Sequence, residues 1–219
     1  MKRPEMDSEV EERRFWQAAF QGLARGFSYP DARWVSSLLS GQWPDALAEI
    51  MKPWGLSADG LKRAVIELPL ESGAALEALQ VEYTYLFINA VPRVPAPPYA
   101  SAYTGQGLLM AEPAEAALRA YREAGLALAK DYQDLPDHLA AELEFLAWLG
   151  QQGITAFEKG EEHEANQWEK RGKAFLSQQV LSWLPEFCRR VEEASRISFY
   201  RELARLAGVL LERIAETKA

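Results

Sequence analysis

The segment "LAAELEFLAWLG", residues 139–150, decides the fold of this chain. Leu139, Leu143, Leu146 and Gly150 recur at helical spacing and form one apolar stripe. Three further residues widen that stripe: Phe145, Trp148 and Leu149. A helix that is apolar over so wide an arc lies at the centre of a protein rather than on its surface. The sequence therefore predicts a central helix here, with other helices packed around it.

Helical periodicity continues on both sides of this segment. A Ser8–Glu11 capping box predicts the start of a first helix, and another helix is expected from about Glu71 to Asn89. The last helix repeats apolar residues in a regular three-four pattern: Tyr200, Leu203, Ala207, Leu210 and Ile214. The sequence lacks the alternating pattern of β-strands and any repeat of 20 to 50 residues. We therefore predict one all-α domain over residues 1–219, bundle-like, with roughly nine or ten helices.

Two charged stretches need separate interpretation. "EKGEEHEANQWEK", residues 158–170, predicts a charged, solvated connection or an exposed turn. "EERRFWQ", residues 11–17, is similar to the core of a twin-arginine export signal. The residues that follow are interrupted by Gln21 and Arg25 instead of forming a continuous apolar run. We therefore interpret Arg13 and Arg14 as part of an amphipathic helix.

Charge and cysteine content limit the classes of partner. The chain of 219 residues has a net charge of −8, which disfavours nucleic acid and suits a basic peptide or protein, although solubility alone explains such a charge. Cys188 is the only cysteine, so neither an internal disulfide nor a thiolate metal cluster can form. No apolar run approaches the roughly 18 residues that a membrane span requires, so no stable membrane insertion is expected.

A proline-rich segment, residues 90–104, interrupts the helices. It contains four prolines within seven residues and is followed by tyrosines: Pro92, Pro95, Pro97, Pro98, Tyr99 and Tyr103. Polyproline conformation makes no internal hydrogen bonds, and tyrosine offers a flat apolar face together with a hydroxyl group. The segment is therefore either a crossover packed between helices or a preorganised contact surface.

Candidate catalytic groups are few. The sequence contains no phosphate-cradling glycine loop and no nucleophile elbow, and His163 lies in a charged run. His138 follows Asp137 at a predicted helix start, with Glu142 one turn later. This group is either a helix cap or a hydrogen-bonding pair that reads a ligand, in which Asp137 could hold an arginine in a bidentate pair. We predict no catalytic residue, metal site or cofactor, with a helical enzyme using His138 with Asp137 or Glu142 as one alternative.

Three motifs in order resemble one family. They are Glu82-Tyr83-x-x-Leu86-Phe87, then Pro97-Pro98-Tyr99-x-Ser101-x-Tyr103, then Pro136-Asp137-His138 followed by "ELEFLAWL". Together they resemble the TorD/DmsD family, cytoplasmic chaperones that mature molybdenum-containing redox enzymes. The resemblance covers residues 75 to 215, including the closing helices. Departures from the family pattern concern the identity of the client: Tyr99 where many members have tryptophan, Ala100 where an acid is frequent, Asn89 and Ala90 in place of glycines, and one displaced acid in "DLPDH".

The resemblance implies an all-helical protein without catalytic activity, located in the cytoplasm. Its partner would be the twin-arginine signal peptide of the precursor of a molybdopterin-dependent oxidoreductase, held back from export until folding and cofactor insertion are complete. Some members form domain-swapped dimers, so a homodimer is expected as one state. The remaining alternative is a structural adaptor that binds folded protein through its exposed aromatic residues.

The same motifs carry over a set of peptide-binding residues. Three lie on the helix before the proline-rich segment, four in the segment itself, and two at the later helix start: Tyr83, Leu86 and Phe87; Pro98, Tyr99, Ser101 and Tyr103; Asp137 and His138. An acidic groove with aromatic and apolar walls suits a leader that carries two cations beside an apolar stretch.

Overall fold

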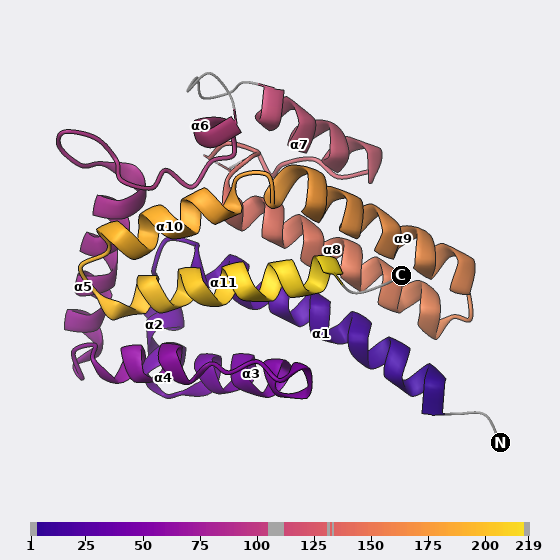
Figure 1. The fold of residues 1–219 in the computed structure, drawn as a ribbon, viewed down its shortest axis with the longest axis horizontal. Coiled ribbons are helices and arrows are strands. Elements are labelled where there is room, and N and C mark those ends of the chain that lie inside the picture. Colours follow the sequence, from indigo (N-terminus) through magenta and orange to yellow (C-terminus); the bar gives the residue numbers. More distant parts are fainter. Residues whose placement is uncertain (1–3, 105–111, 131, 133, 217–219) are drawn as a thin grey trace.

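The predicted central helix is α8, Leu139–Glu158, which packs most extensively against α1, Pro4–Gly26, and α9, Glu162–Phe175. The structure is a computed structural model that describes residues 4–104, 112–130, 132 and 134–216. Figure 1 shows α1, α8 and α9 running side by side. A Cβ atom on Gly150 would lie 3.1 Å from Cβ of Gln17, so the glycine in the apolar stripe lets α1 approach α8 closely.

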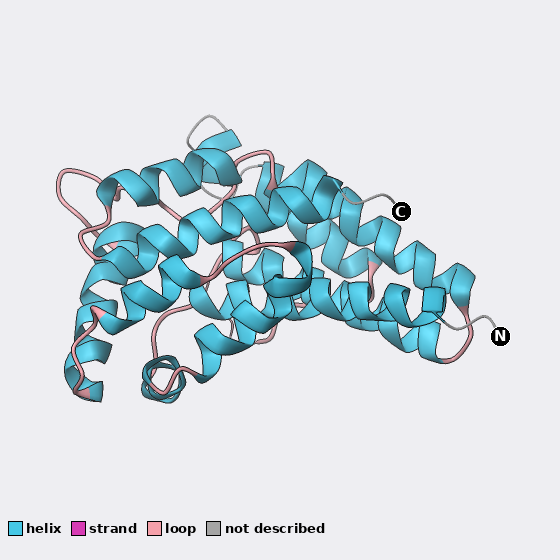
Figure 2. Cartoon of the chain, turned by 60° about the horizontal axis from the view of Figure 1, so that its bottom comes forward, coloured by secondary structure: helices cyan, strands magenta, loops and turns pink. Residues whose placement is uncertain are grey.

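Helices joined by loops make up the rest of the described chain (Figure 2). The other α-helices are α2 (Ala32–Leu39), α3 (Gln42–Met51), α4 (Asp59–Ile66), α5 (Ser72–Tyr83), α6 (Ser101–Thr104), α7 (Glu112–Glu123), α10 (Leu184–Ala194) and α11 (Ser198–Glu216). A 3₁₀ turn, Lys52–Trp54, follows α3, and π-helical turns extend α5 over Thr84–Ile88 and α9 over Leu176–Val180. The all-α prediction is confirmed. The described residues hold eleven α-helices rather than nine or ten because α6 is a single short turn and the charged stretch is helical.

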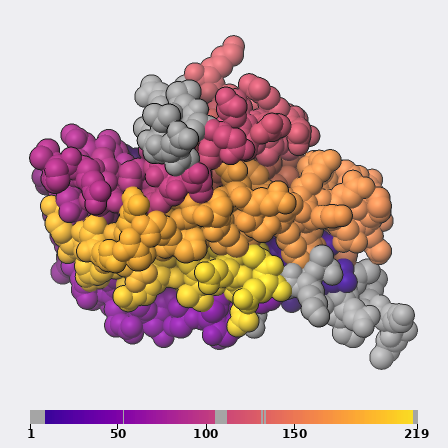
Figure 3. Space-filling view, turned by 45° about the horizontal axis from the view of Figure 1, so that its top comes forward, coloured from indigo at the N-terminus to yellow at the C-terminus, as the bar shows by residue number. Residues whose placement is uncertain are grey.

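The C-terminal helices complete the core. α10 and α11 pack against each other, and α11 also packs against α4, while α2 contacts α5 and α1 contacts α3. Figure 3 shows α10 and α11, in orange and yellow, lying across one face of the molecule. Their inner faces bring aromatic rings together, with Phe27 and Phe87 both against Phe187 at 5.5 and 5.8 Å between ring centroids. These rings belong to the main hydrophobic cluster of the buried residues.

The interpretation of residues 158–170 as a connection is wrong for most of that stretch. Only residues 159–161 separate α8 from α9, and α9 begins at Glu162. Side chains four residues apart pair along α9, as in Glu169–Lys173 at 3.0 Å, while Ala165 is buried beside Gly153 of α8. Such pairs stabilise a helix whose outer face is charged. The charge run therefore marks the outer face of a helix rather than a loop.

The arginine pair near the N-terminus belongs to α1, which confirms the helix prediction, although α1 begins at Pro4 rather than Ser8. The Arg13 side chain is almost fully buried and donates to Asn166 Oδ1 at 2.7 Å and to Glu169 Oε2 at 3.0 Å. Arg14 donates to Glu158 Oε1 at 2.8 Å. Both guanidinium groups therefore connect α1 to the α8–α9 pair.

Glu82 connects α5 to the chain between α10 and α11. Its side chain is 3% exposed, and Oε1 accepts hydrogen bonds from Ser195 Oγ at 3.1 Å and from the Arg196 backbone N–H at 2.6 Å. Arg196 Nε also donates to Glu82 Oε2 at 2.8 Å. A buried carboxylate with three donors holds the turn between α10 and α11 against α5, so the acidic residue of the Glu82-Tyr83 motif has a structural role.

We expect Glu82→Ala to destabilise the fold by about 2 kcal/mol, because it leaves the Arg196 backbone N–H without its acceptor and removes the carboxylate that pairs with Arg196 Nε. The Ser195 hydroxyl keeps Ile197 O as an acceptor. For a chain of this size the melting temperature should fall by roughly 4 to 8 °C. Glu82→Gln, which keeps one acceptor oxygen, should lose less. Glu77→Ala, an exposed position on the same helix, is the control. Equal melting temperatures for the Glu82→Ala and Glu77→Ala variants would contradict this role.

Candidate functional site

The proline-rich segment is held along its middle, from Ala96 to Ala100, by backbone hydrogen bonds to two other parts of the chain. Ala96 N–H donates to Leu86 O at 3.0 Å, and Leu139 N–H donates to Pro98 O at 2.8 Å. Ala100 N–H donates to Asp137 O at 3.1 Å, which forms an isolated antiparallel bridge between Tyr99 and His138. The segment therefore lies against the end of α5 and the start of α8, as a crossover would.

A pocket of about 200 Å³ opens where these three parts meet. We call it the site pocket, and it is lined by Ser28, Tyr29, Tyr83, Phe87, Ile88, Pro98, Tyr99, Tyr132, Asp134, His138, Ala140, Ala141 and Glu144. Five of the nine sequence-predicted residues lie in this lining: Tyr83, Phe87, Pro98, Tyr99 and His138. The three motifs, 55 residues apart at Tyr83 and His138, thus converge on one cavity.

The other four predicted residues lie outside the lining. Leu86 is fully buried in the core. Ser101 and Asp137 are also fully buried, and Asp137 Oδ2 accepts from the Ser101 backbone N–H at 2.8 Å. Tyr103 stacks on Trp183 at 5.2 Å, with the Arg190 guanidinium 4.7 Å from its ring centroid. The Asp137 side chain therefore holds the backbone of the proline-rich segment, and it has no exposed surface that an arginine could contact.

His138 caps α8 and forms part of the pocket wall. Its Nδ1 accepts from the Ala140 backbone N–H at 3.1 Å, which leaves the proton of the neutral ring on Nε2. That nitrogen lies 3.5 Å from the Tyr83 hydroxyl, which donates onward to Phe27 O at 3.0 Å. Burial lowers the pKa of His138 below its ordinary 6.5, and Asp134 and Asp137 only partly oppose this. The ring is therefore a neutral cap, as one of the two interpretations of the sequence held.

Glu142 does not belong to the pocket lining. It is fully buried, and its Oε1 accepts from Gln179 Nε2 at 3.1 Å, a side chain that also donates to Pro113 O. Burial raises the pKa of Glu142 well above its usual value, so the acid is held neutral. The pairing of His138 with Glu142 that an enzyme would use is therefore not assembled in the pocket.

Two carboxylates that sequence reasoning missed lie at the pocket instead. Asp134 Oδ1 accepts from the Tyr99 hydroxyl at 2.7 Å and from the Leu135 N–H at 2.8 Å. Glu144 is exposed on the surface of α8, yet desolvation by its surroundings raises its pKa, although Arg25 opposes the shift. One signal could have found them: Asp134 precedes the cap residue by four positions, and Glu144 follows Ala141 by three on the same face of α8.

Tyrosine rings complete the walls. Tyr29 packs edge-on against Tyr83 at 5.3 Å, and Tyr99 packs edge-on against His138 at 5.3 Å. Tyr132 donates from its hydroxyl to Leu135 O at 3.2 Å, which places its ring beside Asp134. Aromatic faces next to carboxylates in a partly desolvated cavity favour a guanidinium or another flat cation. Among the described residues no three metal-ligating side chains gather in one place.

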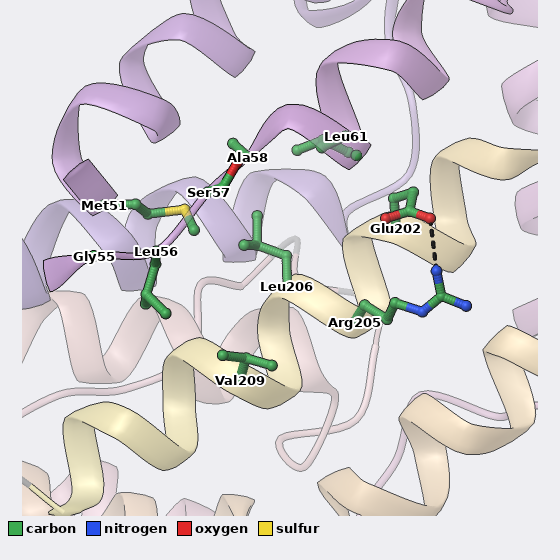
Figure 4. Close-up of a pocket in the computed structure, with 11 residues that line it drawn as sticks. Met51, Gly55, Leu56, Ser57, Ala58, Leu61, Glu202, Arg205, Leu206 and Val209 are labelled. Atoms are coloured by element: carbon green, nitrogen blue, oxygen red, sulfur yellow. Dashed lines mark hydrogen bonds and ion pairs between the residues drawn. The ribbon is translucent and has the colours of Figure 1, made fainter.

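A second pocket, of about 250 Å³, lies between the α3–α4 connection and α11 (Figure 4). Apolar side chains line most of it, including Met51, Leu56 and Leu206. The two charged residues in its lining pair with each other, since Arg205 Nη1 donates to Glu202 Oε1 at 2.8 Å. This pocket holds none of the motif residues, so the site pocket remains the candidate.

Within the part of the chain that the structure describes, no helix combines the length and the apolar character that a membrane crossing demands.

Comparisons with known proteins show which family this chain is similar to. The family described as nitrate reductase delta subunit matches residues 47–189. The chaperone protein TorD of Vibrio parahaemolyticus is 31% identical over 159 residues, which cover 72% of this chain and 70% of the relative. A selenate reductase assembly chaperone protein of Thauera selenatis is 38% identical over 95 residues, 43% of this chain and 47% of that protein.

A solved structure is also similar. The crystal structure of an Archaeoglobus fulgidus protein assigned to redox enzyme maturation superposes with a TM-score of 0.57 and 27% identity, over 90% of this chain and 93% of that chain. The family match spans more than half of the chain, and the TorD relative is aligned over more than two thirds of its own length. This chain therefore belongs to the TorD/DmsD family of chaperones.

Proposed function

We propose that this chain is a cytoplasmic chaperone that binds the twin-arginine signal peptide of a molybdenum-containing oxidoreductase precursor. Holding the leader would delay export until the precursor has folded and received its cofactor. The relatives support this role, since their names describe chaperones and, for the Thauera selenatis protein, the assembly of selenate reductase. The chain would act by binding, without a chemical step of its own.

One observation carries the proposal: the site pocket combines two carboxylates, Asp134 and Glu144, with four tyrosine rings. An arginine pair needs hydrogen-bond acceptors for its donors and flat surfaces for its guanidinium planes. Partial burial strengthens such pairing relative to bulk water. The overall charge of −8 adds a long-range attraction for a cationic leader.

The direct test is calorimetric titration with a precursor that carries its leader, the same precursor without it, and the isolated leader peptide. Binding of the leader peptide at micromolar affinity or better supports the proposal. Unchanged binding of the leaderless precursor together with no binding of the peptide would instead identify an adaptor for folded protein. A leader in which both arginines are replaced by glutamine should bind more weakly than the natural one.

Neutralising the pocket carboxylates should weaken leader binding. We expect Asp134→Asn and Glu144→Gln each to reduce affinity roughly tenfold, about 1.4 kcal/mol, because each removes a charge-assisted acceptor. The effect should be much smaller for the leader that lacks both arginines. Glu49→Gln makes the same charge change at an exposed site on α3 and serves as the control. An equal loss in the Glu49→Gln variant would show that only net charge matters.

Two substitutions of Tyr99 distinguish the contribution of its aromatic ring to binding from that of its hydroxyl group. Tyr99→Ala should weaken leader binding roughly tenfold by removing a ring that faces the ligand, with little change in melting temperature because the ring is only half-buried. Tyr99→Phe keeps the ring but frees Asp134 Oδ1 from the tyrosine hydroxyl, so affinity should be retained or increased. A large drop in the melting temperature of Tyr99→Ala with unchanged binding would make the ring purely structural.

Leader binding should weaken as the pH falls from about 7 to about 5. The pKa of Glu144 is raised above its ordinary 4.5, so this acceptor takes up a proton earlier than an exposed glutamate would. A bound arginine favours the ionised form of the Glu144 carboxyl, so binding releases the proton of that carboxyl. The affinity for the leader therefore falls as the pH is lowered. Isothermal titration at several pH values checks the slope, and the Glu144→Gln variant should show a flatter profile. An identical slope in that variant would exclude Glu144 as its source.

A further inference from the structure

The site pocket does not end at Glu144. A neighbouring cavity of about 270 Å³, which we call the middle cavity, shares Tyr132, Ala141 and Glu144 with the site pocket. A further cavity of about 280 Å³, which we call the third cavity, shares Phe145 with the middle cavity. Their α8 residues follow one another along the helix, from His138 through Ala141 and Phe145 to Leu149. Three adjoining cavities thus form one groove along a single face of α8, which we call the α8 groove.

Chemistry changes along this groove. The middle cavity is walled by Leu126, Leu128, Phe145 and Trp148, and among the described residues of its lining only Glu144, which it shares with the site pocket, is charged. Both carboxylates therefore lie toward the N-terminal end of α8, and the apolar middle cavity follows them along the helix. The third cavity, at the far end of the groove, adds the charged residues Glu123 and Arg171 beside Phe145, Leu149 and Phe175. A ligand with cations at one end and an apolar chain at the other can satisfy both regions in only one direction.

The wall opposite α8 is fixed in place by the end of α7. Gly125 has φ +79, and its N–H donates to Arg122 O at 2.9 Å, while Leu126 N–H donates to Tyr121 O at 2.9 Å. This is the pair of hydrogen bonds that closes a helix with a left-handed glycine. Tyr121 is itself anchored, since its hydroxyl donates to Pro136 O at 2.7 Å. The leucines of the wall are therefore set by the backbone rather than by a ligand.

We propose that the apolar stretch following the arginine pair of the leader lies in the α8 groove. The leader chain would run from the N-terminal toward the C-terminal end of α8. This inference rests on the proposed function and adds a direction to it. From His138 to Leu149 the helix advances about 16 Å, enough to contact roughly five residues of an extended peptide or eleven of a helical one. Charge complementarity at one end and continuity of the cavities carry the assignment.

Site-specific cross-linking tests the direction. Leader peptides carry a photoreactive phenylalanine derivative either four residues before or six residues after the arginine pair, and mass spectrometry locates the label on the full chain. The probe after the arginines should label the wall around Leu126, Leu128 or Trp148, and the probe before them should not. The reverse pattern, or labelling outside the groove by both probes while the peptides still bind, overturns the inference and leaves the proposed function intact. Peptides that do not bind at all overturn the proposed function itself.

A charge placed on the wall gives a second measurement. Leu128 is half-buried in a connecting segment, so Leu128→Asp should fold. It should weaken binding of the full leader roughly tenfold, and leave a shortened peptide that keeps the arginines but lacks the apolar stretch unaffected. Leu70→Asp, at a position 94% exposed between α4 and α5, is the matched control. Equal losses for the long and short peptides, or no loss for either, would overturn the groove assignment.

Discussion

The candidate site depends on one buried carboxylate. Asp137 Oδ2 accepts from the Ser101 backbone N–H, and the Asp137 carbonyl oxygen accepts from the Ala100 N–H. The nearby Leu139 N–H donates to Pro98 O. These contacts dock a segment that has few hydrogen bonds of its own onto the first turn of the central helix. A polyproline path is stiff but cannot pair with itself, so an outside partner must fix its position. Asp137 provides that partner, and the aromatic wall carried by Tyr99 follows from it.

This arrangement changes what the Asp137-His138 motif means. Both side chains have structural roles in the site. Asp137 fixes the proline-rich segment, and His138 caps α8 through Nδ1. The charges that remain available to a ligand belong to Asp134 and Glu144, on either side of the motif. Asp137 is fully buried, so an external cation could reach its second oxygen, Oδ1, only by displacing the residues packed over it. The motif thus preorganises the pocket rather than making its polar contacts.

Periodicity in the sequence was enough to predict the architecture where one face of a helix is apolar. The α8 stripe and the three-four pattern of α11 are such cases, and both are helices in the structure. Apolar periodicity did not predict the helix over most of residues 158–170. The stabilising contacts of α9 come instead from ion pairs such as Glu169–Lys173 and from Arg13 of a distant helix. For the site, the resemblance of the motifs to one family pointed to Tyr83, Phe87 and Tyr99, and the structure brings these residues to one pocket. Asp134 and Glu144 were not predicted, because their spacing from His138 and Ala141 indicates a shared pocket only once the start and the inner face of α8 are known.

The two carboxylates at one end of the α8 groove also have a kinetic consequence. Charges that lie partly in solvent act over about a Debye length, roughly 8 Å at physiological ionic strength, so they influence how often a cationic segment arrives in a productive orientation. Apolar contacts act only after arrival and determine how long the segment stays. In a protein built this way, ionic strength would govern the rate of encounter, whereas the side chains of the apolar wall would govern the lifetime of the complex. Capture and release would then be adjustable through separate residues.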